Sequence, residues 1–141
     1  MTFGQKKMND ILQLIPQRPP FVFVDKVVYA DEQNAEVSYI IKEDCPLVED
    51  RQLPLAGLLE HAAQSCAARV GYLHSTQNEP IRIGYIGAVK KIELKRVPSV
   101  GECLVTKVTL LENVLDISLL QCDTFIEEEL IAQTTLKLAL V

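Results

Sequence analysis

One apolar stretch, from Leu53 to Tyr72, constrains the fold of this chain more than any other segment. At about 100° per residue, its hydrophobic side chains and the next leucine cover a broader arc than a surface helix usually shows. They are Leu55, Leu58, Leu59, Ala62, Ala63, Cys66, Val70 and Leu73. A helix with such an arc is buried on most of its sides. The sequence therefore predicts a central helix against which the rest of the chain packs.

Two polar side chains of this helix define a candidate site. Glu60 and Gln64 lie four residues apart on the arc that the apolar residues leave free, flanked by Gly57, Ala68 and Gly71. Because small neighbours leave room beside a carboxylate, this arc predicts a lined cavity. Spacing alone leaves two interpretations of Glu60 open: a catalytic carboxylate, or a structural one that pairs with a lysine or arginine from another segment.

A second polar line runs along the neighbouring arc. His61, Ser65 and Arg69 follow one another at four-residue intervals, and we expect them to face solvent or a partner subunit. Pro54 suits the first helical turn, where its missing N–H is no loss. The amides of that turn point outward and can donate to an oxygen acceptor. The helix therefore brings a carboxylate and free amides together.

Composition limits the classes of protein to consider. With 141 residues, 48% of them hydrophobic, residues 1–141 are expected to form a single domain with a real core. A net charge of −5 gives no electrostatic footprint for nucleic acid, and there is no basic amphipathic helix for a membrane surface. The four cysteines are widely spaced and only two histidines are present, so no metal site and no cofactor are expected. Without a signal peptide or membrane-spanning run, the expected location is the cytoplasm.

Strand patterns occupy most of the remaining chain. A short amphipathic helix is expected at 7–15, followed by strands at 21–29 and 35–41 that can form a hairpin. After the central helix the pattern predicts four strands in an antiparallel meander, at 81–94, 103–111, 115–126 and 130–141. Gly84 and Gly87 indicate a bulge or a close backbone approach in the first of these four. The predicted fold is α+β, with one curled antiparallel sheet around one helix.

Two motifs resemble those of the 3-hydroxyacyl-acyl carrier protein dehydratases, which have the hot-dog fold. IPQRPPFVFVDKV at 15–27 is similar to the N-terminal motif of that family, and PLAGLLEHAAQ at 54–64 is similar to its helix. IGAVKKIELKRVPSVGE at 86–102 and LIAQTTLKLAL at 130–140 resemble its later strands. The resemblance spans almost the whole chain and implies a hot-dog fold.

The chain departs from that family at its catalytic histidine. The family supplies this histidine from a segment ahead of the helix, and the corresponding place falls near Pro46, where no histidine stands. Gln17 replaces the histidine of the N-terminal motif, and Leu55 stands where the helix-start glycine would be. A divergent branch of predicted dehydratases, some linked to aryl-polyene pigment pathways, has a similar proline-to-glutamate helix without the usual histidine segment, and this chain resembles that branch most.

The resemblance implies the removal of water from a 3-hydroxyacyl thioester carried by acyl carrier protein or CoA, in fatty acid or polyene-type biosynthesis. In that reaction Glu60 would handle the proton at the hydroxyl, with Gln64 holding water or the carboxylate in place. The amides of Leu55 and Ala56 would bind the thioester carbonyl. His61 is a candidate for the missing base, although helix geometry turns it about 100° from Glu60.

Two other functions compete with this one: a thioesterase on the same fold, which requires no histidine, and a non-catalytic subunit that binds an acyl chain or pairs with an active dehydratase. A curled sheet leaves exposed edges, and the resemblance implies dimers whose sites lie between subunits. Both points predict a homodimer, with a heteromer as the alternative. Four basic residues could dock an acidic carrier protein, although such a cluster is more often a solvated surface: Lys90, Lys91, Lys95 and Arg96.

Overall fold

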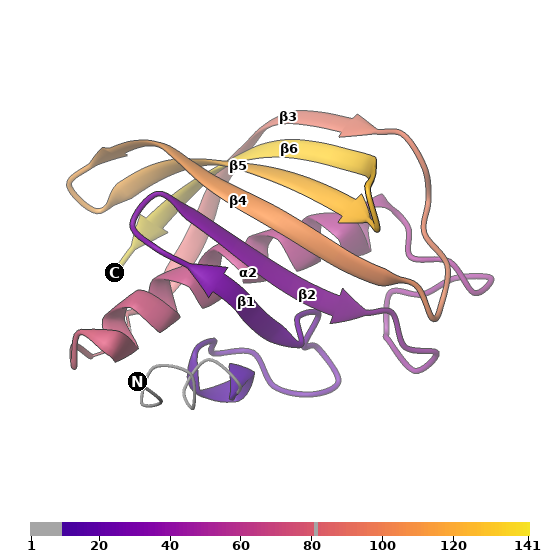
Figure 1. Cartoon of the computed structure of the whole chain (residues 1–141), viewed down its shortest axis with the longest axis horizontal. Coiled ribbons are helices and arrows are strands. Elements are labelled where there is room, and N and C mark those ends of the chain that lie inside the picture. The colour runs from indigo at the N-terminus through magenta and orange to yellow at the C-terminus, as the bar shows by residue number, and fades with distance from the viewer. Residues whose placement is uncertain (1–9, 81) are drawn as a thin grey trace.

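The computed structural model describes residues 10–80 and 82–141, which form one curled sheet around one long helix (Figure 1). Its elements are the 3-10 helix η1 (Ile11–Gln13), β1 (Lys26–Ala30), β2 (Asn34–Ile40), α2 (Leu55–Thr76), β3 (Gly84–Leu94), β4 (Cys103–Val114), β5 (Ile117–Ile126) and β6 (Glu129–Leu140). The predicted α+β class and the central helix are confirmed. Of the helix expected at 7–15, residues 7–9 lie outside the described residues, and only η1 forms in the remainder.

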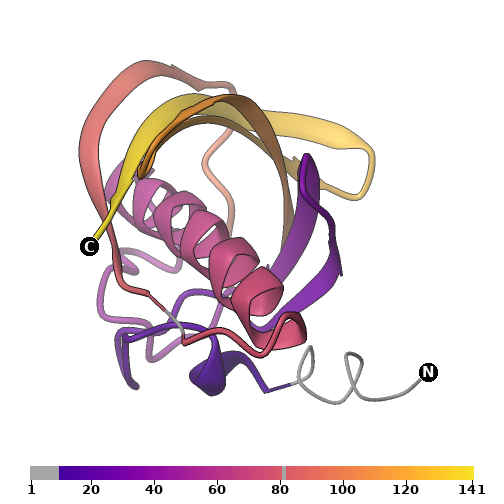
Figure 2. The same cartoon turned by 90° about the vertical axis from the view of Figure 1, so that its left-hand side faces the viewer.

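The sheet is antiparallel throughout, with the strand order β1-β2-β4-β5-β6-β3. Figure 2 shows it arching over α2, while the segment that precedes β1 lies on the open side of the helix. The predicted hairpin of β1 and β2 is confirmed. The predicted meander is wrong for β3, which pairs with β6 instead of β4. Turn residues mark where a strand ends but not which strand becomes its neighbour, so the local pattern could not predict this crossover.

The first predicted strand is shorter than its alternating pattern suggested. Residues 21–25 are not part of the sheet ladder, and β1 begins at Lys26. The backbone of this segment instead meets a side chain of α2, since the N–H of Phe23 donates to Gln64. Residues 21–25 therefore lie against the helix, and this arrangement brings the N-terminal motif beside the helix motif.

The face of α2 that meets the sheet differs from the predicted apolar arc. Half of that arc is buried, but four of its members are only half-buried: Leu55, Leu59, Ala63 and Leu73. The buried residues of α2 instead include five polar ones, which are His61, Gln64, Ser65, Arg69 and Ser75. The expectation that His61, Ser65 and Arg69 face solvent or a partner is therefore wrong. Apolar pattern alone misplaces this helix because buried polar groups are tolerated wherever they find partners.

The small residues beside Glu60 and Gln64 serve close packing rather than a cavity. A Cβ on Gly71 would lie 2.2 Å from the carbonyl oxygen of Leu14, and one on Gly57 would lie 2.2 Å from the side chain of Leu53. Ala68 is fully buried in the cluster that contains Leu14. The lined cavity expected on this arc is thus filled by the N-terminal segment and by the loop ahead of α2.

Strand β3 forms one edge of the sheet and carries the expected irregularity. Its register with β6 shifts between Ile86 and Ala88, around Gly87, and again between Val89 and Lys91. The strand also exposes large hydrophobic side chains, among them Tyr85, Val89 and Ile92. A long edge strand with exposed apolar residues is a surface for pairing with another chain.

Candidate active site at the start of the central helix

Gln64 occupies the centre of the candidate site, where only 1% of it is exposed. Its Oε1 accepts a hydrogen bond from the backbone N–H of Phe23 at 2.7 Å. Its Nε2 donates to the carbonyl oxygen of Phe21 at 3.0 Å and to Oε2 of Glu60 at 2.9 Å. Because the peptide N–H of Phe23 can only donate, it fixes which end of the carboxamide faces Glu60.

Glu60 is half-buried and lies at the more exposed end of the hydrogen bonds around Gln64. Its Oε2 accepts the hydrogen bond from Gln64, whereas Oε1 accepts none from the residues that the structure describes. None of the ion pairs found among those residues includes Glu60. The carboxylate therefore has one oriented oxygen and one that remains open to a ligand.

The first turn of α2 carries free amides close to Glu60 in the helix. Pro54 is the N-cap, and its carbonyl accepts hydrogen bonds from Gly57 and Leu58. The amides of Leu55 and Ala56 have no such backbone partner among the described residues, and Ala56 precedes Glu60 by four residues, about one helical turn. A carbonyl oxygen placed at this helix start would meet unpaired donors and the positive end of the helix dipole.

His61 turns away from Glu60 and into the sheet. It is fully buried, with Nδ1 2.7 Å from the carbonyl oxygen of Phe23 and Nε2 2.8 Å from Oγ1 of Thr106. Burial lowers the pKa of His61 to about 4, although the hydrogen bond to Phe23 works in the opposite direction. The imidazole is therefore neutral at pH 7 and both of its nitrogens are engaged within the core.

The rest of the polar line on α2 is also occupied. Ser65 donates to the carbonyl oxygen of His61 at 2.8 Å, and Arg69 donates to the carbonyl oxygen of Glu32 in the β1–β2 turn at 2.5 Å. Burial lowers the pKa of Arg69. The Ser65 bond stays within α2, whereas Arg69 ties the helix to the β1–β2 turn.

A narrow crevice separates the first half of α2 from strands β3 and β6. Leu55, Leu59 and Ile92 line it, together with the buried hydroxyl groups of Thr124 and Thr134. Its volume is only about 10 Å³, which is about the space of one water molecule. A single chain therefore has no room for an acyl chain in this crevice.

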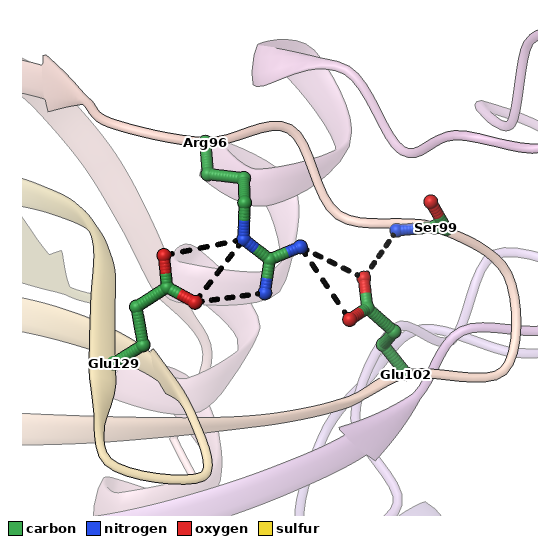
Figure 3. Close-up of polar contacts among 4 residues, drawn as sticks. All are labelled: Arg96, Ser99, Glu102 and Glu129. Carbon is green, nitrogen blue, oxygen red and sulfur yellow. Dashed lines mark hydrogen bonds and ion pairs between the residues drawn. The ribbon is translucent and has the colours of Figure 1, made fainter.

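The four basic residues considered for carrier-protein docking differ in their surroundings. Lys90, Lys91 and Lys95 are exposed on β3 and just after it. Arg96 lies between Glu102 and Glu129, and hydrogen bonds from its guanidinium reach both carboxylates (Figure 3). Its charge is therefore balanced within the chain, whereas the lysines remain available.

Sequence reasoning missed Thr106 and Thr124, whose hydroxyl groups meet at 2.7 Å beneath α2. Both occupy inward positions on β4 and β5, in rows of residues that are otherwise mostly apolar, such as Leu104 and Val108. A threonine in such a row signals a buried hydroxyl that needs a partner. The period-two pattern contained this signal, but it could not show that the partner is His61.

A model of the ApeP-like family, described as ApeP dehydratase, matches residues 9–140. The chain belongs to the ApeP-like dehydratase family. The resemblance to hot-dog dehydratases is thereby confirmed, together with the fold. No curated protein matches the chain. Among the described residues of this ApeP-like chain, no helix is long and apolar enough to cross a membrane.

Solved structures share the fold at low sequence identity. One is the dehydratase heterocomplex ApeI:P from Xenorhabdus doucetiae, 14% identical, with a TM-score of 0.86 over 93% of this chain and 90% of that chain. Another is Cj0977, a sigma28-regulated virulence protein from Campylobacter jejuni, 11% identical, with a TM-score of 0.75 over 98% and 90%. The PaaI protein from the phenylacetic acid degradation operon of E. coli is 13% identical, with a TM-score of 0.62 over 80% of each chain. At these identities the similarity shows the fold alone.

Proposed function

We propose that this chain is one subunit of a dehydratase that removes water from 3-hydroxyacyl thioesters, carried by acyl carrier protein or by CoA. The observation that carries the proposal is the pair of Glu60 and Gln64, in which the carboxamide orients one carboxylate oxygen and leaves the other open. In the reaction Glu60 donates a proton to the departing hydroxyl group. The amides of Leu55 and Ala56 donate hydrogen bonds to the thioester carbonyl, whose oxygen gains negative charge as the enolate forms.

The base that removes the proton next to the carbonyl comes from another chain. This protein has two histidines. His61 is buried with both ring nitrogens occupied. His74 stands fourteen residues after Glu60 on α2, roughly 20 Å along the helix axis. A second dehydratase-family chain that carries the family's histidine would complete the site, and the ApeI:P heterocomplex supports such a pairing.

The shape of the molecule supports a site shared between chains. The crevice beside α2 holds about 10 Å³, whereas sites for small organic ligands typically enclose about 300–1,000 Å³. The β3 edge is open, and its exposed Tyr85, Val89 and Ile92 offer an apolar surface for another strand. In this proposal the partner adds to β3 and, together with α2, forms the walls of the acyl-binding groove. The exposed Lys90, Lys91 and Lys95 would attract an acidic carrier protein.

The test is dehydration by the chain mixed with a purified histidine-bearing dehydratase-family partner. The substrate is a 3-hydroxyacyl thioester on carrier protein, and the enoyl product is followed together with any free thiol. Glu60→Gln should lower turnover about a hundredfold or more, the usual contribution of a general acid. Glu79→Gln, an exposed glutamate beyond the end of α2, is the control and should leave turnover unchanged.

Three outcomes would contradict the proposal. Unchanged turnover with Glu60→Gln would remove Glu60 from the reaction. Release of free thiol without enoyl product would indicate a thioesterase. Full activity of the isolated chain would show that no partner histidine is needed.

A further inference from the structure

Glu60 stands at one end of a series of hydrogen bonds that starts on the inner face of the sheet and passes through the backbone of Phe23. Five hydrogen bonds form it: Thr124 Oγ1 to Thr106 Oγ1 at 2.7 Å, Thr106 Oγ1 to His61 Nε2 at 2.8 Å, His61 Nδ1 to Phe23 O at 2.7 Å, Phe23 N to Gln64 Oε1 at 2.7 Å, and Gln64 Nε2 to Glu60 Oε2 at 2.9 Å. We call this series the Glu60 chain. It links β5, β4, α2 and the segment before β1, and only its last member reaches the surface.

The direction of every hydrogen bond in the Glu60 chain can be assigned. The carbonyl oxygen of Phe23 can only accept, so Nδ1 of His61 carries the ring proton. Burial keeps this ring neutral at pH 7, with a pKa of about 4, so Nε2 is an acceptor and the hydroxyl of Thr106 donates to it. The oxygen of Thr106 then accepts from the hydroxyl of Thr124.

The remaining two hydrogen bonds follow the same direction. The N–H of Phe23 donates to Gln64, and the carboxamide of Gln64 donates to Glu60. All five donors thus point toward the carboxylate. The bonds from Thr124 to the carbonyl of Phe23 form one run, and those from the N–H of Phe23 to Glu60 form a second run. The bonds within each run polarise one another, more so where water is excluded. Thr106 and Thr124 are almost fully buried, at 0% and 2% exposure, so water does not compete at the start of the series.

We propose that His61, Thr106 and Thr124 are positioning residues for Glu60, and that they act by holding the backbone of Phe23 and, through it, the carboxamide of Gln64. His61 restrains one side of the Phe23 Cα by bonding its carbonyl, and Gln64 bonds its N–H on the other side. A shift of this backbone would move the N–H, turn the carboxamide and release Oε2 of Glu60. The consequence for catalysis rests on the proposed function, whereas the positioning itself does not.

The test of positioning uses NMR of the ¹⁵N-labelled chain and does not depend on activity. The wild type should show His61 protonated at Nδ1 and unprotonated at Nε2. Thr106→Val should shift the side-chain amide resonances of Gln64, and Thr106→Ser should restore them because it keeps the hydroxyl. Thr134→Val is the matched control: Thr134 lies on the same inner face, is 7% exposed, and its hydroxyl has no partner among the described residues.

Either of two NMR results would overturn the inference: the opposite tautomer of His61, or Gln64 resonances that respond equally to Thr106→Val and Thr134→Val. If Thr106→Val does not fold, Thr124→Val tests the same series one step further from Glu60, with Thr124→Ser as its rescue.

Kinetics of the assembled dehydratase then test the catalytic consequence. Thr106→Val should lower kcat about fivefold, the effect of one net hydrogen bond, with KM unchanged. Thr106→Ser should restore kcat, and Thr109→Val, which changes a half-buried threonine on the outer face of β4, should leave it at the wild-type value. A change in KM alone would contradict the positioning role. If the wild-type complex forms no enoyl product, the proposed function fails, and the NMR result still decides whether the Glu60 chain holds Gln64.

Discussion

Two polar networks of this molecule differ in their access to water. The Glu60 chain links one carboxylate to neutral groups that are buried. The surface network consists of Arg96, Glu102 and Glu129 (Figure 3), whose side chains are 36%, 32% and 56% exposed. Its single guanidinium forms five hydrogen bonds to the two carboxylates.

The comparison shows that the number of polar contacts does not measure their contribution to stability. When a surface ion pair is removed, water solvates the groups that remain, so exposed pairs contribute little. When one member of a buried series is removed, its neighbour stays desolvated and unpaired. Three predictions sharpen this contrast, in order of decreasing effect.

The largest expected effect is a loss of stability in acid that depends on His61. Its pKa is about 4 in the folded protein, below the ordinary value of 6.5. Above pH 6.5 the ring is neutral in both states and stability is highest. Between pH 6.5 and pH 4 the unfolded chain binds a proton that the folded chain does not, so the free energy of unfolding falls as the pH falls. The loss should reach roughly 3 kcal/mol near pH 4 and increase no further below it.

Urea unfolding of the wild type and of His61→Gln, from pH 7 to pH 4, measures this loss. A glutamine side chain does not titrate, so the difference between the two curves isolates the histidine from the carboxyl groups. We expect the free energies of unfolding to converge as the pH falls, because only the wild type loses the histidine contribution. Parallel curves would show that His61 is not held neutral in the folded protein.

The second prediction concerns Gln64→Leu. This substitution leaves the N–H of Phe23 and the carbonyl of Phe21 without their partner, and the first of these groups is buried. The free energy of unfolding should fall by about 2 kcal/mol. The matched control is Gln121→Leu, whose carboxamide also donates to a carboxylate, that of Asp123, but from a half-buried position on the outer face of the sheet. If urea unfolding showed equal losses in the free energy of unfolding for both substitutions, the expected difference between buried and surface hydrogen bonds would be contradicted.

The smallest effect is expected for Arg96→Gln, although it removes the most polar contacts. Hydrogen bonds with Glu129 and Glu102 raise the pKa of Arg96, and the pKa of Glu102 is lowered by the N–H of Ser99 and by Arg96. These groups are exposed, so the loss in the urea midpoint should be smaller than for Gln64→Leu and should vanish at high salt. A large loss of stability that persists in high salt would show that the surface network contributes as much to stability as the buried one.

The sequence predicted much of the candidate site, because its two motifs lie in continuous segments. Glu60 and Gln64 are four residues apart on one helix, so their contact follows from helix geometry. The partners of His61 could not be predicted in this way, since Phe23 and Thr106 lie 38 and 45 residues away from it. The apolar arc did not predict which face of α2 is buried, because α2 is rich in alanine and small residues pack on either face.

By itself, the sequence determined the position of the central helix, the presence of β-strands around it and the family of the chain. Periodicity and turn residues act between near neighbours, so they are visible in one dimension. Only the tertiary structure decided which face of α2 meets the sheet, that β3 pairs with β6, and that His61 is buried in the core. Each of these depends on partners distant in the chain, and a buried polar group is stable only when such a partner is in place.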